Sequence, residues 1–379
     1  MKHGMYLYPW DLEDEGTDVV VGRLRDAGID SLALATSYHA GKFLRPHANG
    51  RRVYFPEDGT VYFRPDVSRY GRIKPRINSR VAHFDSLAAL AKSAPDMSVT
   101  GWTVGLHNTP LGEAHADLVV RNAFGDPLWN ALCPAQPEVR RYLVSLCADL
   151  AHNHPVAEIA IETPGWQAYR HGHHHEFELI DLTARAQVLL GMCFCDACVA
   201  GAAKAGGDAA RLAQRTRDEL DRFLANGTEP ATDPLVDPEW SGFLAWRAAT
   251  VTSLVEEVRA AMPQEVGLAV IPTTQSPNSL CWIEGSDLAA LAKIARLEVP
   301  AYQSGVPAIL SDVAATKMAA GPGARLGYIV RPTYPNLPSA GDVRTVVREI
   351  GATGAASISF YNYGHMRLSS LDWIKAALG

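Results

Sequence analysis

One acidic residue stands directly after an apolar run. Glu162 follows Ile159-Ala-Ile161, at the end of a predicted strand over Val156–Ile161. A carboxylate at the end of a buried strand is partly removed from water, and desolvation raises its pKa toward that of a proton donor at neutral pH. We predict that Glu162 is a catalytic acid. The alternative is a structural salt bridge with an arginine of a neighbouring strand.

Four cysteines have the spacing of a metal site. Cys193, Cys195 and Cys198 form a C-x-C-x-x-C motif, and Cys133 is the best candidate for a fourth ligand. Four thiolates complete a tetrahedron and leave no open position, so we predict a structural zinc ion. The alternative is that these thiols are free and packed as small hydrophobic side chains. Cys147 falls on an amphipathic stretch and is expected in the core.

A histidine-rich run, residues 169–176, follows Glu162 closely. Clustered imidazoles can bind a metal or form hydrogen bonds with sugar hydroxyls. Consecutive residues of a strand alternate between its two faces, so the adjacent histidines cannot all point inward there. We predict that His173 and His174 contact a substrate; a metal site and a solvated loop are the alternatives.

Polar and aromatic side chains recur at or just beyond the ends of the predicted strands. Sugars offer hydroxyl edges to polar groups and apolar C–H faces to aromatic rings, so this recurrence favours a carbohydrate pocket. The alternative is that large aromatic residues often lie between core and surface. The predicted binding residues are Trp10, Tyr38, His39, His107, Trp166, Tyr302, Arg331 and Tyr361.

The spacing of apolar residues predicts the elements that must position these groups. Short apolar runs alternate with helical stretches, as in parallel strands joined by helices. Eight strands predict an α/β fold, a (β/α)8 TIM-type barrel in one domain over residues 1–379. The alternative, an open doubly wound sheet, usually has a Gly-rich phosphate loop that is missing here. The predicted strands are Gly4–Tyr8, Ser31–Thr36, Ser98–Leu106, Val156–Ile161, Val266–Ile271, Leu297–Tyr302, Leu326–Arg331 and Ala356–Tyr361.

Two long insertions follow strand ends, over residues 38–81 and 163–238. In the first, Val53–Phe55 and Val61–Phe63 flank Asp58-Gly59, which predicts a β-hairpin. The second carries the histidine-rich and cysteine-rich segments. Both follow strands two and four at their carboxyl ends, the face that holds the active site in barrels.

The segment Ala131–Gly201 resembles the first half of the barrel in glycoside hydrolase family 42 β-galactosidases. The resemblance rests on Cys133, on Pro137-x-x-Arg140, on the strand that ends in Glu162 and on the C-x-C-x-x-C motif, and it covers under a fifth of the chain. The same serial order is similar to that of bacterial (β/α)8-barrel glycosidases without an assigned activity. The resemblance implies zinc on the cysteines and a general acid/base role for Glu162.

The sequence departs from the family 42 pattern in two places. The family has Asn directly before its acid/base Glu, where this chain has Ile161. The family also has a nucleophilic Glu after the seventh strand, whereas residues 327–334 contain no carboxylate. We therefore carry over neither the retaining mechanism nor specificity for galactosides.

Cleavage of a glycosidic bond usually needs a second carboxylate. Asp11, Glu284 and Asp287 follow predicted strands. The two aspartates are more typical of helix caps. We therefore predict Glu284 as the second catalytic group, the alternative being a solvated loop glutamate.

Three functions remain open on these grounds. The first is a hydrolase that cleaves a glycoside or oligosaccharide with Glu162 and Glu284. The second is a metal-dependent sugar isomerase or lyase whose ligands include His39, His107, His173 and Glu162. The third is a non-catalytic carbohydrate-binding barrel, which the missing seventh-strand Glu suggests.

Composition narrows the choice of partners. The 379 residues are 47% hydrophobic and 20% charged, enough to bury a large core. The 35 basic residues do not exceed the 41 acidic ones, so we do not expect nucleic-acid binding. No apolar run of ~18 residues and no secretory signal are present, so we expect a cytoplasmic protein without a membrane span. A homo-oligomer remains open.

Overall fold

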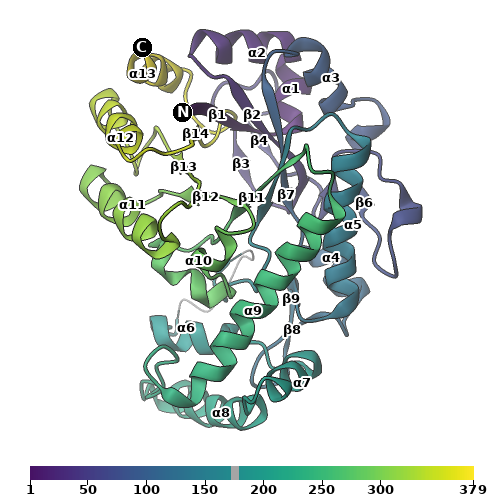
Figure 1. Ribbon diagram of the computed structural model, residues 1–379, viewed down its shortest axis with the longest axis vertical. Coiled ribbons are helices and arrows are strands. Elements are labelled where there is room, and N and C mark those ends of the chain that lie inside the picture. Colours follow the sequence, from purple (N-terminus) through teal and green to yellow (C-terminus); the bar gives the residue numbers. More distant parts are fainter. Residues whose placement is uncertain (172–178) are drawn as a thin grey trace.

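Eight parallel strands close into a barrel surrounded by helices, as the computed structural model shows (Figure 1). The structure describes residues 1–171 and 179–379. Strand β1 pairs with both β14 and β2, so the sheet has no free edge within the barrel. All eight predicted strands are present, and the predicted fold class is confirmed. The barrel strands are β1 (Lys2–Leu7), β2 (Ser31–Tyr38), β7 (Ser98–Val104), β10 (Glu158–Glu162), β11 (Gly267–Ile271), β12 (Arg296–Pro300), β13 (Leu326–Val330) and β14 (Ser357–Phe360).

Helices between the strands cover the outside of the barrel. Helix α5 illustrates why these stretches are helical: Pro137 occupies its first turn, and Val139, Leu143, Leu146 and Leu150 recur on one buried face. Cys147 is buried on the same helix, as expected. The helices of the barrel are α1 (Pro9–Glu15), α2 (Thr17–Asp26), α3 (Ser86–Ser93), α4 (Thr109–Ala114), α5 (Pro137–Asn153), α9 (Pro238–Ala261), α10 (Leu288–Leu291), α11 (Val306–Ala320), α12 (Ala340–Ala352) and α13 (Ser369–Leu378), with 3₁₀ turns at Val67–Arg69, Ser79–Ala82 and Asn278–Glu284.

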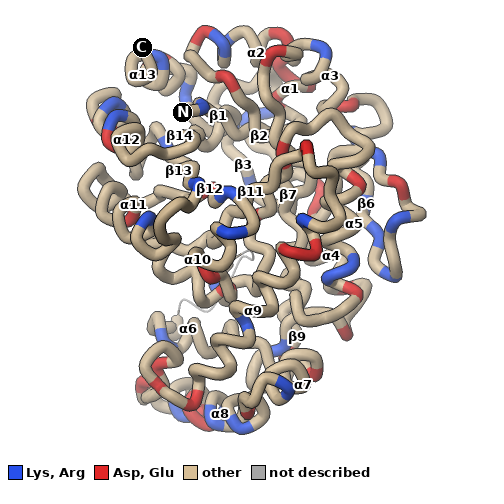
Figure 2. Tube along the Cα trace, viewed as in Figure 1, with Lys and Arg blue, Asp and Glu red and all other residues tan. Residues whose placement is uncertain are grey.

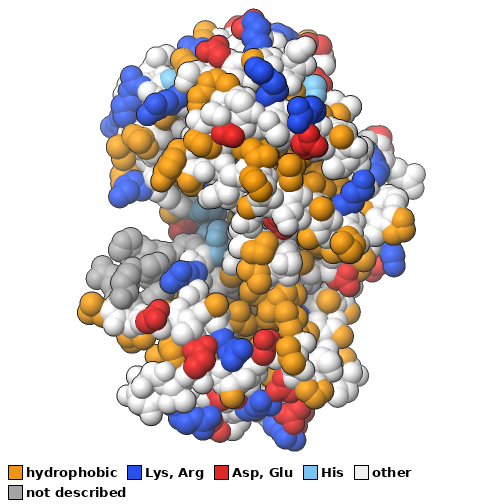
Figure 3. Space-filling view, turned by 90° about the vertical axis from the view of Figure 1, so that its left-hand side faces the viewer, with side chains coloured by type: hydrophobic (Ala, Val, Ile, Leu, Met, Phe, Trp, Pro, Cys, Tyr) orange, Lys and Arg blue, Asp and Glu red, His pale blue; other side chains and the backbone are white. Residues whose placement is uncertain are grey.

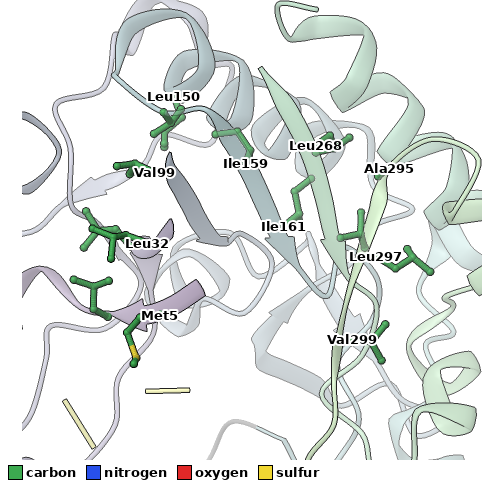
Figure 4. Packing of buried hydrophobic residues seen from close by; sticks show 14 of the residues in the cluster. Met5, Leu32, Val99, Leu150, Ile159, Ile161, Leu268, Ala295, Leu297 and Val299 are labelled. Atoms are coloured by element: carbon green, nitrogen blue, oxygen red, sulfur yellow. The ribbon is translucent and has the colours of Figure 1, made fainter. Parts of the chain in front are cut away.

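Side chains alternate between the inside and the outside of the barrel, because successive residues of a strand point to opposite faces. On β10, Ile159 and Ile161 belong to the apolar layer under the helices. Figure 4 shows these residues among Val99, Leu268 and other members of that layer. Glu158 and Glu162 lie on the opposite face of β10 and line cavities inside the barrel. The alternation therefore sends Glu162 inward.

A charged network fills the amino-terminal end of the barrel. Arg296 pairs with Glu298 on its own strand and with Glu158 at 2.6 Å on β10. Ser357 accepts a hydrogen bond from Arg296 at 2.9 Å, and Ser359 donates one to Glu298 at 2.7 Å. Buried charges are tolerated when they are paired and hydrogen-bonded, and here each charged group has such a partner.

The first insertion contains a hairpin, but not the predicted one. Strand β4 (Val53–Tyr54) pairs with β3 (Phe43–Leu44). Strand β5 (Thr60–Val61) instead pairs with the end of β2 and with β6 (Arg76–Ile77). Gly59 has a positive φ of 58°, as a turn at Asp58-Gly59 requires. However, β5 joins Ser37 and Tyr38, the end of β2 that extends beyond its pairing with β1. The prediction that residues 53–55 pair with 61–63 is wrong.

The second insertion packs beside the barrel (Figure 1). It holds α6 (Ala184–Gly191), α7 (Asp196–Lys204) and α8 (Ala209–Asn226). Helix α8 contacts α6, α7 and the long helix α9. A two-stranded sheet of β8 (Val119–Arg121) and β9 (Pro127–Leu132) precedes α5. Figure 2 shows acidic and basic residues interspersed along the chain, including α8. Among the described helices, none alone is long and apolar enough to cross a membrane; α6 and α7, bent by 91°, pass that test only as a pair.

Because of this charged network, we predict that loss of its arginine strongly lowers the stability of the fold. We expect Arg296→Met to lower the free energy of unfolding by about 3–5 kcal/mol, because the buried Glu298 and the half-buried Glu158 would be left without their cation. Urea unfolding measures this change. The control is Arg348→Met, which removes an arginine exposed by 69% and should change stability by less than about 1 kcal/mol. Equal effects of the two substitutions would contradict the role given to the network.

Candidate functional site

A cavity of about 280 Å³ opens at the carboxyl ends of the strands. Figure 3 shows a hollow in the surface where histidine side chains gather. Of the residues predicted from the sequence, six line this cavity: Tyr38, His39, Glu162, Tyr302, Arg331 and Tyr361. The rest of the lining consists of Tyr6, Trp102, His171, Ile271, Thr273, Thr274, Pro300 and Ile329.

Glu162 is held inside this cavity as a buried carboxyl group. Its Oε2 accepts a hydrogen bond of 2.7 Å from Nε1 of Trp102 on the neighbouring strand β7. Burial raises the pKa of Glu162 to about 7, although the Trp102 hydrogen bond and the Arg331 guanidinium oppose the rise. A carboxyl group with this pKa exists in both protonation states at neutral pH, so it can donate and accept a proton.

The residue after Glu162 has a strained backbone. Thr163 has a φ of 42°, a region that β-branched residues seldom adopt. Its amide donates to the carbonyl of Ile271 at 3.0 Å, and its hydroxyl accepts from Gln167 at 3.2 Å. These bonds hold the sharp turn that leads the chain away from Glu162. Such strain is typical of functional sites.

Tyrosine hydroxyls meet at the wall of the cavity. Tyr8 donates to Tyr38 at 3.1 Å, and its hydroxyl lies 3.0 Å from that of Tyr361. Burial raises the pKa of all three phenols above the ordinary value, so they are neutral at pH 7. Neutral phenols are donors and acceptors for a polar ligand such as a sugar hydroxyl.

Three histidines gather beside the cavity: His39 and His107 just after β2 and β7, and His171 in the loop that follows β10. The ring of His39 stacks on that of His107 at 4.1 Å, and His171 lies 5.1 Å from His107. One nitrogen from each ring lies within 4.8 Å of the others. Burial lowers the pKa of His39 and brings that of His171 to about 4, so both rings are neutral. The predicted binding residues His173 and His174 lie outside the described residues.

Besides His107, which stacks on His39, two predicted binding residues do not line the cavity. Trp10 is fully buried, with its ring 4.3 Å from that of Tyr8. Trp166 is also fully buried, under the guanidinium of Arg247 at 4.0 Å. Both rings therefore pack around the site and do not face the cavity, which corrects the prediction that they bind a ligand. Both rings follow strand ends, but the chain turns back over the barrel after each strand and covers them.

The Glu284 carboxylate does not line the cavity either. It accepts hydrogen bonds from the amide of Thr274 at 3.1 Å and from its hydroxyl at 2.7 Å. Burial raises the pKa of Glu284 to about 7, against these hydrogen bonds. Since Thr274 lines the cavity and Glu284 does not, Glu284 positions the loop after β11. This placement corrects the prediction of Glu284 as a second catalytic group.

The two aspartates considered from the sequence are helix caps. Asp11 accepts a hydrogen bond of 3.0 Å from the amide of Tyr8 in a capping box at the start of α1. Asp287 accepts one of 3.0 Å from the amide of Ala290 at the start of α10. Among the described residues that line the cavity, Glu162 is therefore the one carboxylate.

Sequence reasoning missed Tyr6 and Trp102, which lie within strands rather than beyond them. Trp102 pairs in register with Ala160, two residues before Glu162. The same two-residue period that turns Glu162 inward therefore turns Trp102 inward as well. This alternation was a usable signal, but large aromatic residues in an apolar strand are also typical of core.

The four cysteines converge as the spacing predicts. The sulfur of Cys133 lies 3.5 Å from that of Cys198, 3.7 Å from that of Cys195 and 3.8 Å from that of Cys193. A tetrahedral ion with bonds of about 2.3 Å to sulfur places its ligands about 3.8 Å apart. The distances are too long for disulfide bonds. The cluster therefore fits a metal ion and joins the end of β9 to the start of α7.

Donors and a buried cation surround the cysteine cluster. The amide of Arg121 donates to the sulfur of Cys193 at 3.4 Å, and the Gln136 side chain donates to that of Cys195 at 3.8 Å. Burial lowers the pKa of Arg247, whereas the nearby thiols raise it. Four thiolates on a divalent ion leave a net negative charge, which Arg247 can balance.

Comparisons with known proteins identify the fold but no family. No family model and no curated protein sequence matches the chain. The PgaB (BpsB) glycoside hydrolase domain from Bordetella bronchiseptica is similar in structure, with 12% sequence identity and a TM-score of 0.59 over 100% of this chain and 99% of that one. The beta-galactosidase from the psychrophilic Marinomonas ef1 has 13% identity and a TM-score of 0.59 over 100% of this chain and 59% of that one. The alpha-L-fucosidase isoenzyme 2 from Paenibacillus thiaminolyticus has 11% identity and a TM-score of 0.51 over 100% of this chain and 49% of that one. At these identities the likeness shows the barrel fold alone. The specific resemblance to family 42 is not confirmed.

The Trp102 hydrogen bond predicts a measurable change in the proton affinity of Glu162. We expect Trp102→Phe to raise the pKa of Glu162 above 7, by about one pH unit, because the variant loses a donor that favours the carboxylate. The protonated form would then persist to higher pH. Carbon-13 NMR titration of labelled glutamate carboxyls measures the value, with Glu162→Gln to assign the signal. Trp129→Phe, at a ring exposed by 41%, should leave the pKa unchanged. A lower pKa in Trp102→Phe would contradict this account.

Proposed function

We propose that this protein is a glycoside hydrolase in which Glu162 is the proton donor. The observation that carries the proposal is a buried carboxyl group with a pKa of about 7 in a cavity rich in aromatic rings and phenol hydroxyls. Aromatic faces and hydroxyl donors suit sugar rings, and a carboxylic acid with a raised pKa suits protonation of a glycosidic oxygen. Similar barrels in solved glycosidases support this class of reaction.

Glu162 would protonate the oxygen that leaves when the glycosidic bond breaks. Tyr38, Tyr361 and His39 would hold hydroxyl groups of the sugar, and Tyr302 would offer a ring face. Two carboxylates usually share this chemistry, but in some glycosidases a tyrosine or the substrate itself takes the place of the second one. A cavity lined by one described carboxylate is compatible with those mechanisms. Tyr38 and Tyr361 are then the candidates in this chain for the tyrosine that replaces the second carboxylate.

The proposal predicts that Glu162→Gln removes turnover and retains binding. We expect kcat to fall by about 10²–10⁴-fold because the amide cannot donate a proton as the acid does. The wild-type rate should fall as pH rises through about 7, where Glu162 loses its proton. Chromogenic pyranosides and furanosides measure turnover, and ligand-observed NMR measures binding.

Two further variants separate the possible outcomes of this experiment. Glu349→Gln, on an exposed side chain, should leave kcat unchanged. Full activity of Glu162→Gln would remove Glu162 from the mechanism. If Glu162→Gln kept full activity while Glu284→Gln abolished turnover at unchanged thermal stability, Glu284 would be the acid instead.

We further propose that the cysteine cluster binds one structural zinc ion. Four sulfurs at tetrahedral spacing, surrounded by N–H donors, suit zinc and leave no position for a substrate. Thiolate ligands persist in a reducing compartment, which agrees with the proposed cytoplasmic location.

The zinc proposal predicts one ion per chain by elemental analysis. Cys195→Ser should lower this content and the melting temperature together, because the ion links β9 to α7. Cys281→Ala removes a thiol outside the cluster and should retain the ion. A purified wild-type protein that is metal-free and stable would contradict the proposal.

A metal-dependent sugar isomerase or lyase is the second candidate. The observation that favours it is the group of His39, His107 and His171 beside the cavity, in which His171 takes the place of the predicted ligand His173. Nitrogens on one ion are about 3.4 Å apart, so the three rings would have to draw together on binding. A second, chelator-labile ion that is needed for activity and is lost in His39→Ala would favour this candidate over the hydrolase.

A further inference from the structure

The guanidinium of Arg331 lies in the cavity without a carboxylate partner among the described residues. It follows the end of β13 and lies over the ring of Tyr302 at 3.6 Å, with the ring of Tyr361 at 5.2 Å. Its Nε is buried and has no hydrogen-bond partner in the described part of the chain. Contacts with two ring faces hold the cation in place but leave the donors at its edge available.

The cavity offers this cation little negative charge. The one described carboxylate in the lining, Glu162, is half protonated near pH 7. His39 and His171 are neutral there, because burial lowers the pKa of each. The lining phenols are neutral as well, because burial raises the pKa of Tyr6, Tyr38, Tyr302 and Tyr361. The described lining therefore carries between zero and one positive charge at neutral pH.

Arg331 is half-buried and has no counter-ion among the described residues, so its cation favours an anionic ligand group at this point. The planar fork of an arginine presents two parallel N–H donors, which match the two oxygens of a carboxylate. Stacking on Tyr302 fixes the plane of that fork in advance, which reduces the conformational entropy lost on binding.

We propose that the cavity binds a sugar that carries a carboxylate, a uronic acid unit, and that Arg331 pairs with this carboxylate. The inference names the substrate class for the proposed glycosidase and depends on that function only for turnover, not for binding. Bound near Glu162, the anion would also favour the protonated form of that acid, the form required to protonate a glycosidic oxygen.

The binding experiment uses free sugars and the full chain. Glucuronate and galacturonate are compared with glucose and galactose by ligand-observed NMR titration at pH 7; free sugars interconvert between anomers, so both are tested. We expect the uronates to bind about 10–100-fold more tightly, the range for a hydrogen-bonded charged group. Glucose 6-phosphate is a further ligand, and tighter binding of this phosphate than of the uronates would overturn the choice of a carboxylate.

Variants of Arg331 test whether this residue causes the preference. Arg331→Gln should remove the preference for uronates, and Arg331→Lys should keep part of it because the charge remains without the planar fork. Arg348→Gln, at an exposed arginine, should retain the full preference. Circular dichroism and melting temperature establish that each variant is folded. Equal binding of neutral and acidic sugars by the wild type, or an undiminished preference in Arg331→Gln, would overturn the inference.

Turnover distinguishes this inference from the proposed function. Hydrolysis of 4-nitrophenyl uronides in preference to the matching neutral glycosides would support both. Arg331-dependent binding of uronates without cleavage of any glycoside would support the inference and contradict the glycosidase. Efficient cleavage of neutral glycosides without a preference for uronates would support the glycosidase and contradict the inference.

Discussion

The structure depends on the alternation of side chains along eight parallel strands that close on themselves. Closure gives every strand an inside and an outside, so one residue in two enters the barrel and the next packs under the helices. Mostly aliphatic side chains, with Tyr328 and Phe360 among them, occupy the outward positions and form the main apolar layer. The inward positions are therefore free to carry polar and aromatic groups, and the site is built from these.

The inward side chains divide the barrel into two levels with different electrostatics. At the amino-terminal end, Arg296 neutralises Glu158 and Glu298 in a compact network. At the carboxyl end, Glu162 and Arg331 lie in a wall of phenol and indole rings without forming an ion pair within the described residues. In the amino-terminal network the charged groups pair with one another, and this pairing stabilises the fold. At the carboxyl end, the Glu162 carboxyl group and the Arg331 cation stay available to a ligand, and the proposed chemistry depends on this property.

Contacts with buried side chains hold the loops that follow the strands. Glu284 binds the backbone and hydroxyl of Thr274, and its carbonyl accepts the amide of Trp166 at 3.1 Å. Trp166 in turn packs in the cluster that contains the four cysteines. A metal ion on those cysteines would therefore stabilise the loop that follows Glu162 without touching the cavity. This connection gives a structural ion a role in the geometry of the site.

The sequence by itself determined the eight strands, the C-x-C-x-x-C part of the cysteine cluster and the inward placement of Glu162. Each follows from a short-range pattern: a period of two along a strand, or ligands a few residues apart. Cys133, 60 residues before Cys193, joins the cluster only through the fold. Tertiary structure alone decided the rest. The path of the loops covered Trp10 and Trp166 and kept Glu284 out of the cavity lining. The edge of β2 drew β5 away from the predicted hairpin. Such outcomes depend on contacts between residues far apart in the chain, which no local periodicity specifies.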